Sequence, residues 1–257
     1  MSPSKASAAT HTDTSEVTFP EPALSLPNFT NQANLREQIR EALRALLING
    51  QMRPGRLYSA PSLAAQFGVS ATPVREAMLD LVSEGLVAVA RNKGFRVTSL
   101  EDRDLDEIAE LRGLIEVPVL RAVAEACTGA VATEVENLRP VARQIVAAAA
   151  KGDLVTYTET DNEFHLRFLG LHGNQHVVAS VRDLRRRSRL YGLEALAAKG
   201  VLAKLAEEHE HMVDAALRQD GNAMQALMAQ HIGHIRSTWA RPDSGTASRP
   251  GLARLPT

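Results

Sequence analysis

The sequence lacks the features that define several special classes of protein. Its 257 residues include one cysteine, Cys127, so no intramolecular disulfide can form. Aromatic residues make up only 4% of the chain, and no apolar run approaches the roughly 18 residues of a membrane-spanning helix. The N-terminus lacks the basic and then apolar layout of a secretory signal. These absences predict a cytoplasmic protein with no membrane partner, in which Cys127 is a small core residue.

The neutral overall charge hides a local excess of positive charge. The chain carries a net charge of −1, but residues 33–98 hold nine Lys/Arg against five Asp/Glu, a net of +4. A local excess of positive charge can attract phosphates even when the protein as a whole is not basic. Taken alone, this excess fits a mildly basic solvated surface better than it fits DNA contact.

Composition and periodicity divide the chain into four parts. Residues 1–31, rich in Ser, Thr, Pro and Ala, predict a disordered arm, and residues 241–257 a flexible tail. Between them, 32–99 predicts a small domain of three helices and a β-hairpin, and 103–240 an all-α bundle. The fold class expected is therefore mainly α. The bundle's helical segments are expected at 103–128, 131–151, 153–171, 174–190, 192–199, 201–219 and 221–240. The first of these carries an apolar stripe of Leu105, Ile108, Leu111, Leu114 and Ile115.

Two short helices joined by a tight turn occupy residues 63–83. Gly68 ends the first, where a left-handed backbone costs least, and Ser70 caps the second. The inward face of the second helix is the set Val74, Ala77, Met78 and Leu81. Ser70, Thr72 and Arg75 remain on its outer face near the N-terminus, where a recognition helix meets the DNA major groove.

A hairpin follows, with its tip at Asn92-Lys93-Gly94. Arg91 and Lys93 at this tip suit contact with the minor groove or with phosphates. The alternative is an ordinary solvated turn.

This region resembles the DNA-binding domain of the GntR family of bacterial transcription regulators. The residues that carry the resemblance are Pro54-Gly55, Leu63-Ala64, Gly68-Val69-Ser70, Thr72-Pro73-Val74-Arg75-Glu76-Ala77, Glu84-Gly85-Leu86-Val87 and Gly94. The resemblance implies a winged helix-turn-helix, and helical periodicity starts its first helix at Leu35. The resemblance also implies a homodimer on a pseudo-palindromic double-stranded DNA operator, acting more often as a repressor than as an activator.

Two positions depart from the family pattern. Relatives often carry Arg directly after the residue that corresponds to Ser70, whereas this chain has Ala71, which leaves Arg75 as the main candidate reader of bases. Many relatives place an acidic residue before Leu63. Ser62 or Ser59 is expected to cap that helix instead.

The helical domain contains a constellation suited to a metal ion. Asp161 and His165 lie at i and i+4 on one helix face, and His209 and His231 follow on later helices. Three imidazoles and one carboxylate suit a divalent transition metal such as Zn, Ni or Mn, one per chain. Spacing alone leaves an alternative to a metal site: Asp161 and His165 form a surface ion pair, and the other histidines are structural.

Residues 103–238 look like the FCD effector domain, which defines the FadR subfamily within GntR. The matching residues are Glu110-Leu111-Arg112, Glu116, Asp161, Phe164-His165, Gly173-Asn174, Glu208-His209 and His231. The resemblance implies that Asp161, His165, His209 and His231 are the metal ligands and that a small organic acid binds inside the bundle. His211 and His234 are near neighbours, and His211, at i+2 from His209, should point away from the site.

Arg112 is expected either to bind the carboxylate of this effector or to pair with Glu116 at i+4, and the two remain open. The run Arg182, Arg185, Arg186, Arg187 and Arg189 is interpreted as a solvated face or a source of ion-pair partners.

The function expected is a metabolite-responsive transcription regulator that is not an enzyme. One alternative is a metal-dependent hydrolase. The sequence argues against a hydrolase, because no general base, nucleophile or oxyanion-stabilising group accompanies the four ligands. The other is a DNA-binding protein whose bundle serves only to dimerise.

Overall fold

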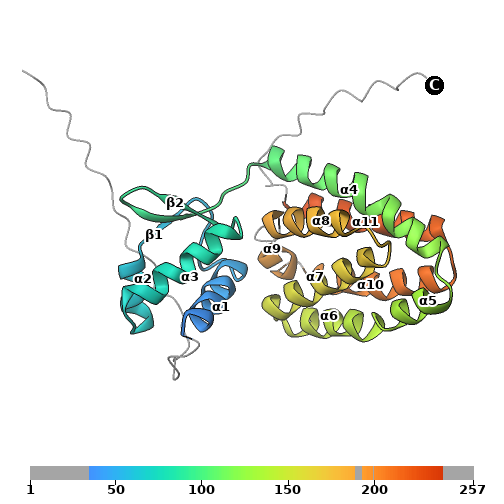
Figure 1. Cartoon of the computed structure of the whole chain (residues 1–257), viewed down its shortest axis with the longest axis horizontal. Coiled ribbons are helices and arrows are strands. Elements are labelled where there is room, and N and C mark those ends of the chain that lie inside the picture. The colour runs from blue at the N-terminus through green and yellow to red at the C-terminus, as the bar shows by residue number, and fades with distance from the viewer. Residues whose placement is uncertain (1–34, 189–192, 199, 240–257) are drawn as a thin grey trace, which may run out of the picture.

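A small mixed domain precedes a helical bundle along the chain (Figure 1). The computed structural model describes residues 35–188, 193–198 and 200–239. The expected arm at 1–31 and tail at 241–257 lie outside these residues. The first domain contains α1 (Leu35–Ile48), β1 (Leu57–Tyr58), α2 (Ala60–Phe67), α3 (Ala71–Ser83), β2 (Val87–Ala90) and β3 (Gly94–Val97).

The ends of α2 and α3 follow from local hydrogen bonding. Ser59 is the N-cap of α2, and its hydroxyl accepts a hydrogen bond from the Ser62 amide at 3.1 Å, so Ser59 rather than Ser62 is the cap. Gly68 ends α2 in the left-handed conformation, with φ of 68°. Ser70 precedes α3 with an extended backbone, but its side chain makes no capping hydrogen bond.

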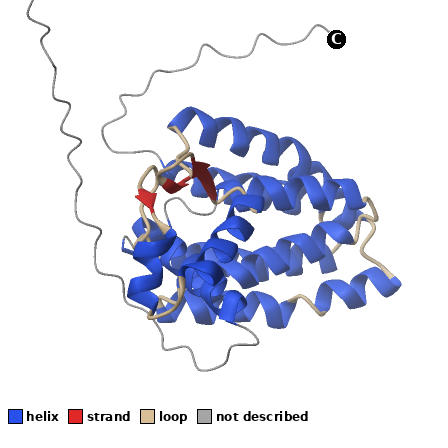
Figure 2. Ribbon diagram, turned by 60° about the vertical axis from the view of Figure 1, so that its left-hand side comes forward, coloured by secondary structure: helices blue, strands red, loops and turns tan. Residues whose placement is uncertain are grey.

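The wing is a three-stranded antiparallel sheet of order β1-β3-β2. Its strands are coloured red in Figure 2. The expected hairpin pairs Val87 with Val97 and Ala90 with Gly94. The third strand, β1, was not expected, because two residues are too few to show an alternating pattern. Gly94 is required here: its φ is 110°, and a Cβ at this position would lie 2.5 Å from the carbonyl oxygen of Tyr58.

Eight helices of the described residues form the second domain (Figure 2). They are α4 (Asp102–Glu125), α5 (Gly129–Glu136), α6 (Arg139–Lys151), α7 (Leu154–Gly170), α8 (Gln175–Ser188), α9 (Leu193–Ala198), α10 (Leu202–Leu217) and α11 (Gly221–Trp239). The prediction of a single helix over 131–151 is wrong, because α5 ends at Glu136 and α6 begins at Arg139. Pro140 lies in the first turn of α6, where its missing N–H costs nothing.

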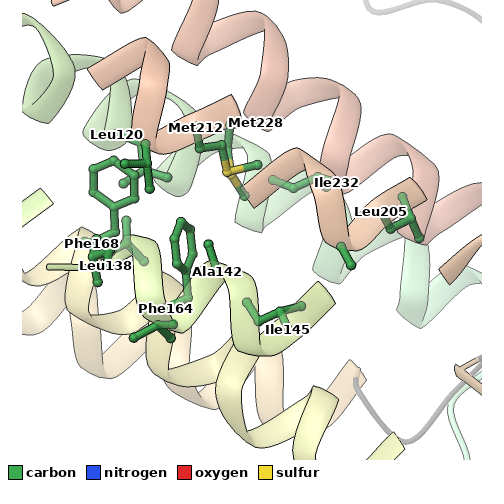
Figure 3. Packing of buried hydrophobic residues seen from close by; sticks show 14 of the residues in the cluster. Leu120, Leu138, Ala142, Ile145, Phe164, Phe168, Leu205, Met212, Met228 and Ile232 are labelled. Atoms are coloured by element: carbon green, nitrogen blue, oxygen red, sulfur yellow. The ribbon is translucent and has the colours of Figure 1, made fainter. Parts of the chain in front are cut away.

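Each domain has its own apolar core. In the bundle, Phe164 and Phe168 of α7 point toward Leu120 of α4 and toward Met212 and Met228 of the last two helices (Figure 3). The end of α1 also reaches this core, because Ile48 packs within the bundle's cluster rather than within that of its own domain. The two domains therefore touch where α1 meets α7.

The apolar stripe expected on the first bundle helix divides between two faces. Leu105 and Ile108 are buried, but Leu111 is 44% exposed and Leu114 is 68% exposed, so the expected stripe is not buried along its whole length. In the part of the chain that the structure describes, no helix has the length and apolar character needed to cross a membrane.

Candidate metal centre and nucleic-acid interface

Three helices bring the four expected ligands together in the middle of the bundle. Asp161 and His165 come from successive turns of α7, His209 from α10 and His231 from α11. All four are buried, at 0–1% exposure, and one ligand atom of each lies within 4.8 Å of the others. The sequence distributes these four residues over three helices, and the fold makes them one cluster.

The distances within the cluster fit donors to one ion. The Nε2 atoms of His165 and His209 are 3.1 Å apart, and Asp161 Oδ1 lies 3.2 Å from His209 Nε2. Adjacent donors bound about 2.1 Å from one metal are separated by about 3.0–3.4 Å in octahedral or tetrahedral geometry. The residues present therefore fit a divalent transition metal.

Outer hydrogen bonds set the orientation of two imidazoles. His209 Nδ1 donates to the carbonyl of Ala206 at 3.0 Å, and His231 Nδ1 donates to Glu208 Oε2 at 2.8 Å. Bonds of this type to a metal-binding histidine fix the tautomer that leaves Nε2 as the ligand atom. His234 donates to the other oxygen of Glu208 at 2.9 Å, so it supports the site from outside, and His211 is exposed as expected.

Burial keeps His165 in the neutral form that binds metals. Desolvation holds the pKa of His165 well below its ordinary value, and the nearby guanidinium of Arg185 lowers it further. The other two imidazoles of the cluster act in the same direction.

Arg185 is part of this site, and of the two roles expected for the arginine run it is an ion-pair partner and not part of a solvated face. Its side chain is fully buried and contacts the carboxylate of Asp161, with Glu116 Oε2 at 3.3 Å. Desolvation, followed by repulsion from Arg112, lowers the pKa of Arg185 to about 9, so the guanidinium remains charged at neutral pH. Arg182 and Arg187 are exposed, and Arg189 lies outside the described residues.

Arg112 forms the ion pair that was one of its two expected roles. Its Nε donates to Glu116 Oε1 at 2.6 Å, and both side chains are buried. Its Nη2 is also buried and has no hydrogen-bond partner. A buried guanidinium N–H without an acceptor is costly, so Nη2 is a donor that an anion could satisfy while the pair with Glu116 stays intact.

Sequence reasoning missed Arg185 and the orienting role of Glu208. The signal for Arg185 was present in the period of α8, because Val178, Val181 and Ser188 share its buried face. An arginine at a core position of an amphipathic helix indicates a buried counter-ion.

The expected DNA-contacting residues share the surface of the first domain. Ser70, Thr72 and Arg75 are exposed at the start of α3, and Arg91 and Lys93 are exposed in the turn between β2 and β3. A helix N-terminus and a wing tip thus present cations and hydroxyls to solvent.

Comparison with known proteins assigns both domains. Residues 35–97 match the family model for bacterial regulatory proteins of the gntR family, and residues 107–234 match the FCD domain. The Nta operon transcriptional regulator of Aminobacter aminovorans is 33% identical over 146 residues, which cover 56% of this chain and 67% of that protein. The HTH-type transcriptional regulator McbR of Escherichia coli is 34% identical over 133 residues, or 52% of this chain and 59% of that protein.

Solved structures show the same architecture. The structure titled E. coli McbR/YncC aligns with a TM-score of 0.61 and 25% identity over 79% of this chain and 95% of that chain. A GntR regulator from Rhodococcus sp. RHA1 aligns with a TM-score of 0.59 and 20% identity over 79% of this chain and 95% of that chain.

The fold and the matches define a transcription regulator built from a winged helix-turn-helix and a helical effector domain, and not an enzyme. The chain belongs to the GntR family and carries an FCD domain, as the sequence motifs predicted.

Proposed function

We propose that this protein is a metabolite-responsive repressor that binds a pseudo-palindromic operator as a homodimer. Residues 32–99 form the DNA-binding domain, and residues 103–240 bind the effector and dimerise. Ser70, Thr72 and Arg75 read the major groove, and Arg91 and Lys93 contact phosphates or the minor groove. The observation that carries the proposal is the buried ligand cluster beside two buried arginines in a chain that also carries a DNA-binding fold.

One divalent ion, such as Zn, Ni or Mn, binds Asp161, His165, His209 and His231. The ion supplies Lewis-acid positions that an oxygen ligand can complete. The supporting evidence is the 3.1 Å and 3.2 Å spacing of the donor atoms and the outer hydrogen bonds that direct Nε2 of His209 and His231 toward the cluster.

The effector is a small carboxylate. A divalent ion with Arg112 and Arg185 brings a charge of +4, against −3 from Asp161, Glu116 and Glu208, so one further negative charge balances the buried group. Uncompensated buried charge costs several kcal/mol, roughly 3–5 when one partner of a pair is missing. Arg112 Nη2 is the donor that such an anion would meet.

The metal proposal is tested by elemental analysis of the purified protein by plasma mass spectrometry. We expect about one metal per chain in the wild type and a loss in His165→Ala. His211→Ala is the matched control, because His211 lies two residues from His209 but is exposed. Wild type without metal after reconstitution with Zn, Ni and Mn would contradict the site and favour a bundle that only dimerises.

The effector proposal is tested by screening carboxylates for release of the zinc-loaded protein from operator DNA. Arg112→Lys keeps a cation beside Glu116 but lacks the forked guanidinium, so we expect the response to weaken while metal content is retained. An unchanged response in Arg112→Lys would remove Arg112 from the effector site.

A further inference from the structure

Glu208 of α10 joins two histidines of α11 through its two carboxylate oxygens. Oε2 accepts a hydrogen bond from His231 Nδ1 at 2.8 Å, and Oε1 accepts one from His234 Nδ1 at 2.9 Å. The two histidines are three residues apart, so they are neighbours on one face of α11. One carboxylate therefore clamps a single turn of α11, and His234 is the outer end of a hydrogen-bonded chain that reaches the ligand cluster.

Glu208 is nearly buried, and His234 connects it with the surface. The side chain of His231 is 0% exposed, that of Glu208 is 7% exposed and that of His234 is 37% exposed. A carboxylate oxygen with so little access to water needs a hydrogen-bond donor from the protein. His234 is the closer donor to Oε1, because Gln230 reaches the same oxygen only at 3.5 Å. Without His234, Glu208 would gain by turning Oε1 toward water, and Oε2 would then move away from His231.

The outer hydrogen bonds of the two oriented imidazoles differ in how firmly they are held. His209 donates to the backbone carbonyl of Ala206 in its own helix, and the helix itself fixes that acceptor. His231 donates to the side chain of Glu208, which can rotate. A histidine binds a metal through Nε2 only while its proton stays on Nδ1. The tautomer of His231 therefore depends on whatever holds the carboxylate of Glu208 in place.

We infer that His234 is a positioning residue of the metal centre, which holds Glu208 against His231 and so sets the affinity for the ion. The inference rests on the proposed metal site and adds to it a residue that is neither a ligand nor fully buried. Outer hydrogen-bond partners of metal-binding histidines typically change metal affinity by about 10–100-fold. His234 acts one bond farther out, through Glu208, so its effect belongs at the lower end of that range.

Zinc affinity of the full-length, metal-stripped protein tests this role by competition with a chelator that changes colour on binding Zn²⁺. His234→Ala should raise the Kd for Zn²⁺ by about tenfold. His234→Asn should recover most of the loss, because the asparagine amide places an N–H donor near the position of the histidine Nδ1–H. Gln230→Ala is the matched control and should bind as the wild type does, since its contact with Oε1 is the longer one. An unchanged Kd in His234→Ala, or no recovery in His234→Asn, would overturn the inference.

Proton NMR of the protein loaded with Co²⁺ distinguishes positioning from a general loosening of the site. A paramagnetic ion shifts the ring protons of its own ligands out of the crowded spectral range, so His209 and His231 should each give a separate, exchangeable Nδ1–H signal. In His234→Ala the His231 signal should be lost through faster exchange with water, and the His209 signal, whose acceptor is Ala206, should remain. Retention of both signals, or loss of both, would contradict the positioning role.

The outcomes separate this inference from the proposed function. A wild type that binds neither Zn²⁺ nor Co²⁺ would overturn both the metal site and the role of His234. A wild type that binds both ions, with an unchanged Kd and both N–H signals in His234→Ala, would overturn only the role of His234, and the four-ligand site would stand.

Discussion

The two domains of this chain bury different kinds of side chain. The core of the winged domain consists of 18 buried apolar residues, from Ile39 to Val97, and all the buried polar and charged residues found in the described part of the chain belong to the bundle. These are Arg112, Glu116, Thr158, Thr160, Asp161, His165, Arg185, Ser188, Glu208, His209 and His231.

This difference shows that the candidate functional residues lie on the surface of the winged domain but in the interior of the bundle. The winged domain uses an apolar core to hold a polar surface in place, so its expected DNA-contacting residues are exposed and can change with little effect on folding. The bundle folds around its polar group, so its expected ligands are also part of its core. Substitutions should therefore separate stability from function in the first domain and couple them in the second.

The largest effect on stability is expected when the buried ion network loses one carboxylate. Glu116→Ala leaves Arg112 and Arg185 without a common partner, and we expect a loss of about 3–5 kcal/mol in the free energy of unfolding by urea. Glu163→Ala is the control, because Glu163 forms an i,i+4 pair with Arg167 in which both side chains are more than 40% exposed. Equal losses in the two variants would show that burial does not distinguish these pairs.

A cavity in the winged domain should be nearly as costly. Leu43 of α1 is fully buried, and Leu43→Ala should reduce the free energy of unfolding by about 2–5 kcal/mol while metal content stays unchanged. Leu79→Ala, at a side chain that is 46% exposed in the same domain, should have a much smaller effect. Loss of metal in Leu43→Ala would mean that the two cores are not independent.

Arg75→Ala should affect function without affecting stability. A bidentate arginine–guanine contact contributes about 1–3 kcal/mol of discrimination, so operator selectivity should fall by about tenfold or more in a gel-shift competition with scrambled DNA. Because Arg75 is exposed, its removal should leave the unfolding midpoint unchanged. Retained selectivity would count against α3 as the recognition helix.

The smallest effect concerns two helix caps in the winged domain. Ser59→Ala removes a side-chain hydrogen bond at 3.1 Å and should cost about 1 kcal/mol in urea unfolding. Ser70→Ala removes no such bond, so it should cost less. If Ser70→Ala is the more destabilising, the hydroxyl of Ser70 does more for the fold than for DNA.

Local patterns in the sequence were enough to predict the helix-turn-helix and the wing. The i,i+3,i+4 spacing around Val74 and Met78, the glycine at 68 and the motif around Arg75 each depend on neighbours within about one turn of helix. The ligand set followed from a family resemblance, and its members then met in the fold within 4.8 Å.

The sequence by itself determined the class of protein, the order of its domains and most of its helices, because hydrophobic periodicity and capping are local properties. Tertiary structure alone decided which counter-ions Arg185 meets, since Asp161 and Glu116 lie 24 and 69 residues away along the chain. It also decided that Leu111 and Leu114 face outward, because an apolar stripe does not specify which neighbour will cover it. Burial of long-range ion pairs and exposure of apolar side chains depend on which helices pack together, and that is a property of the whole fold.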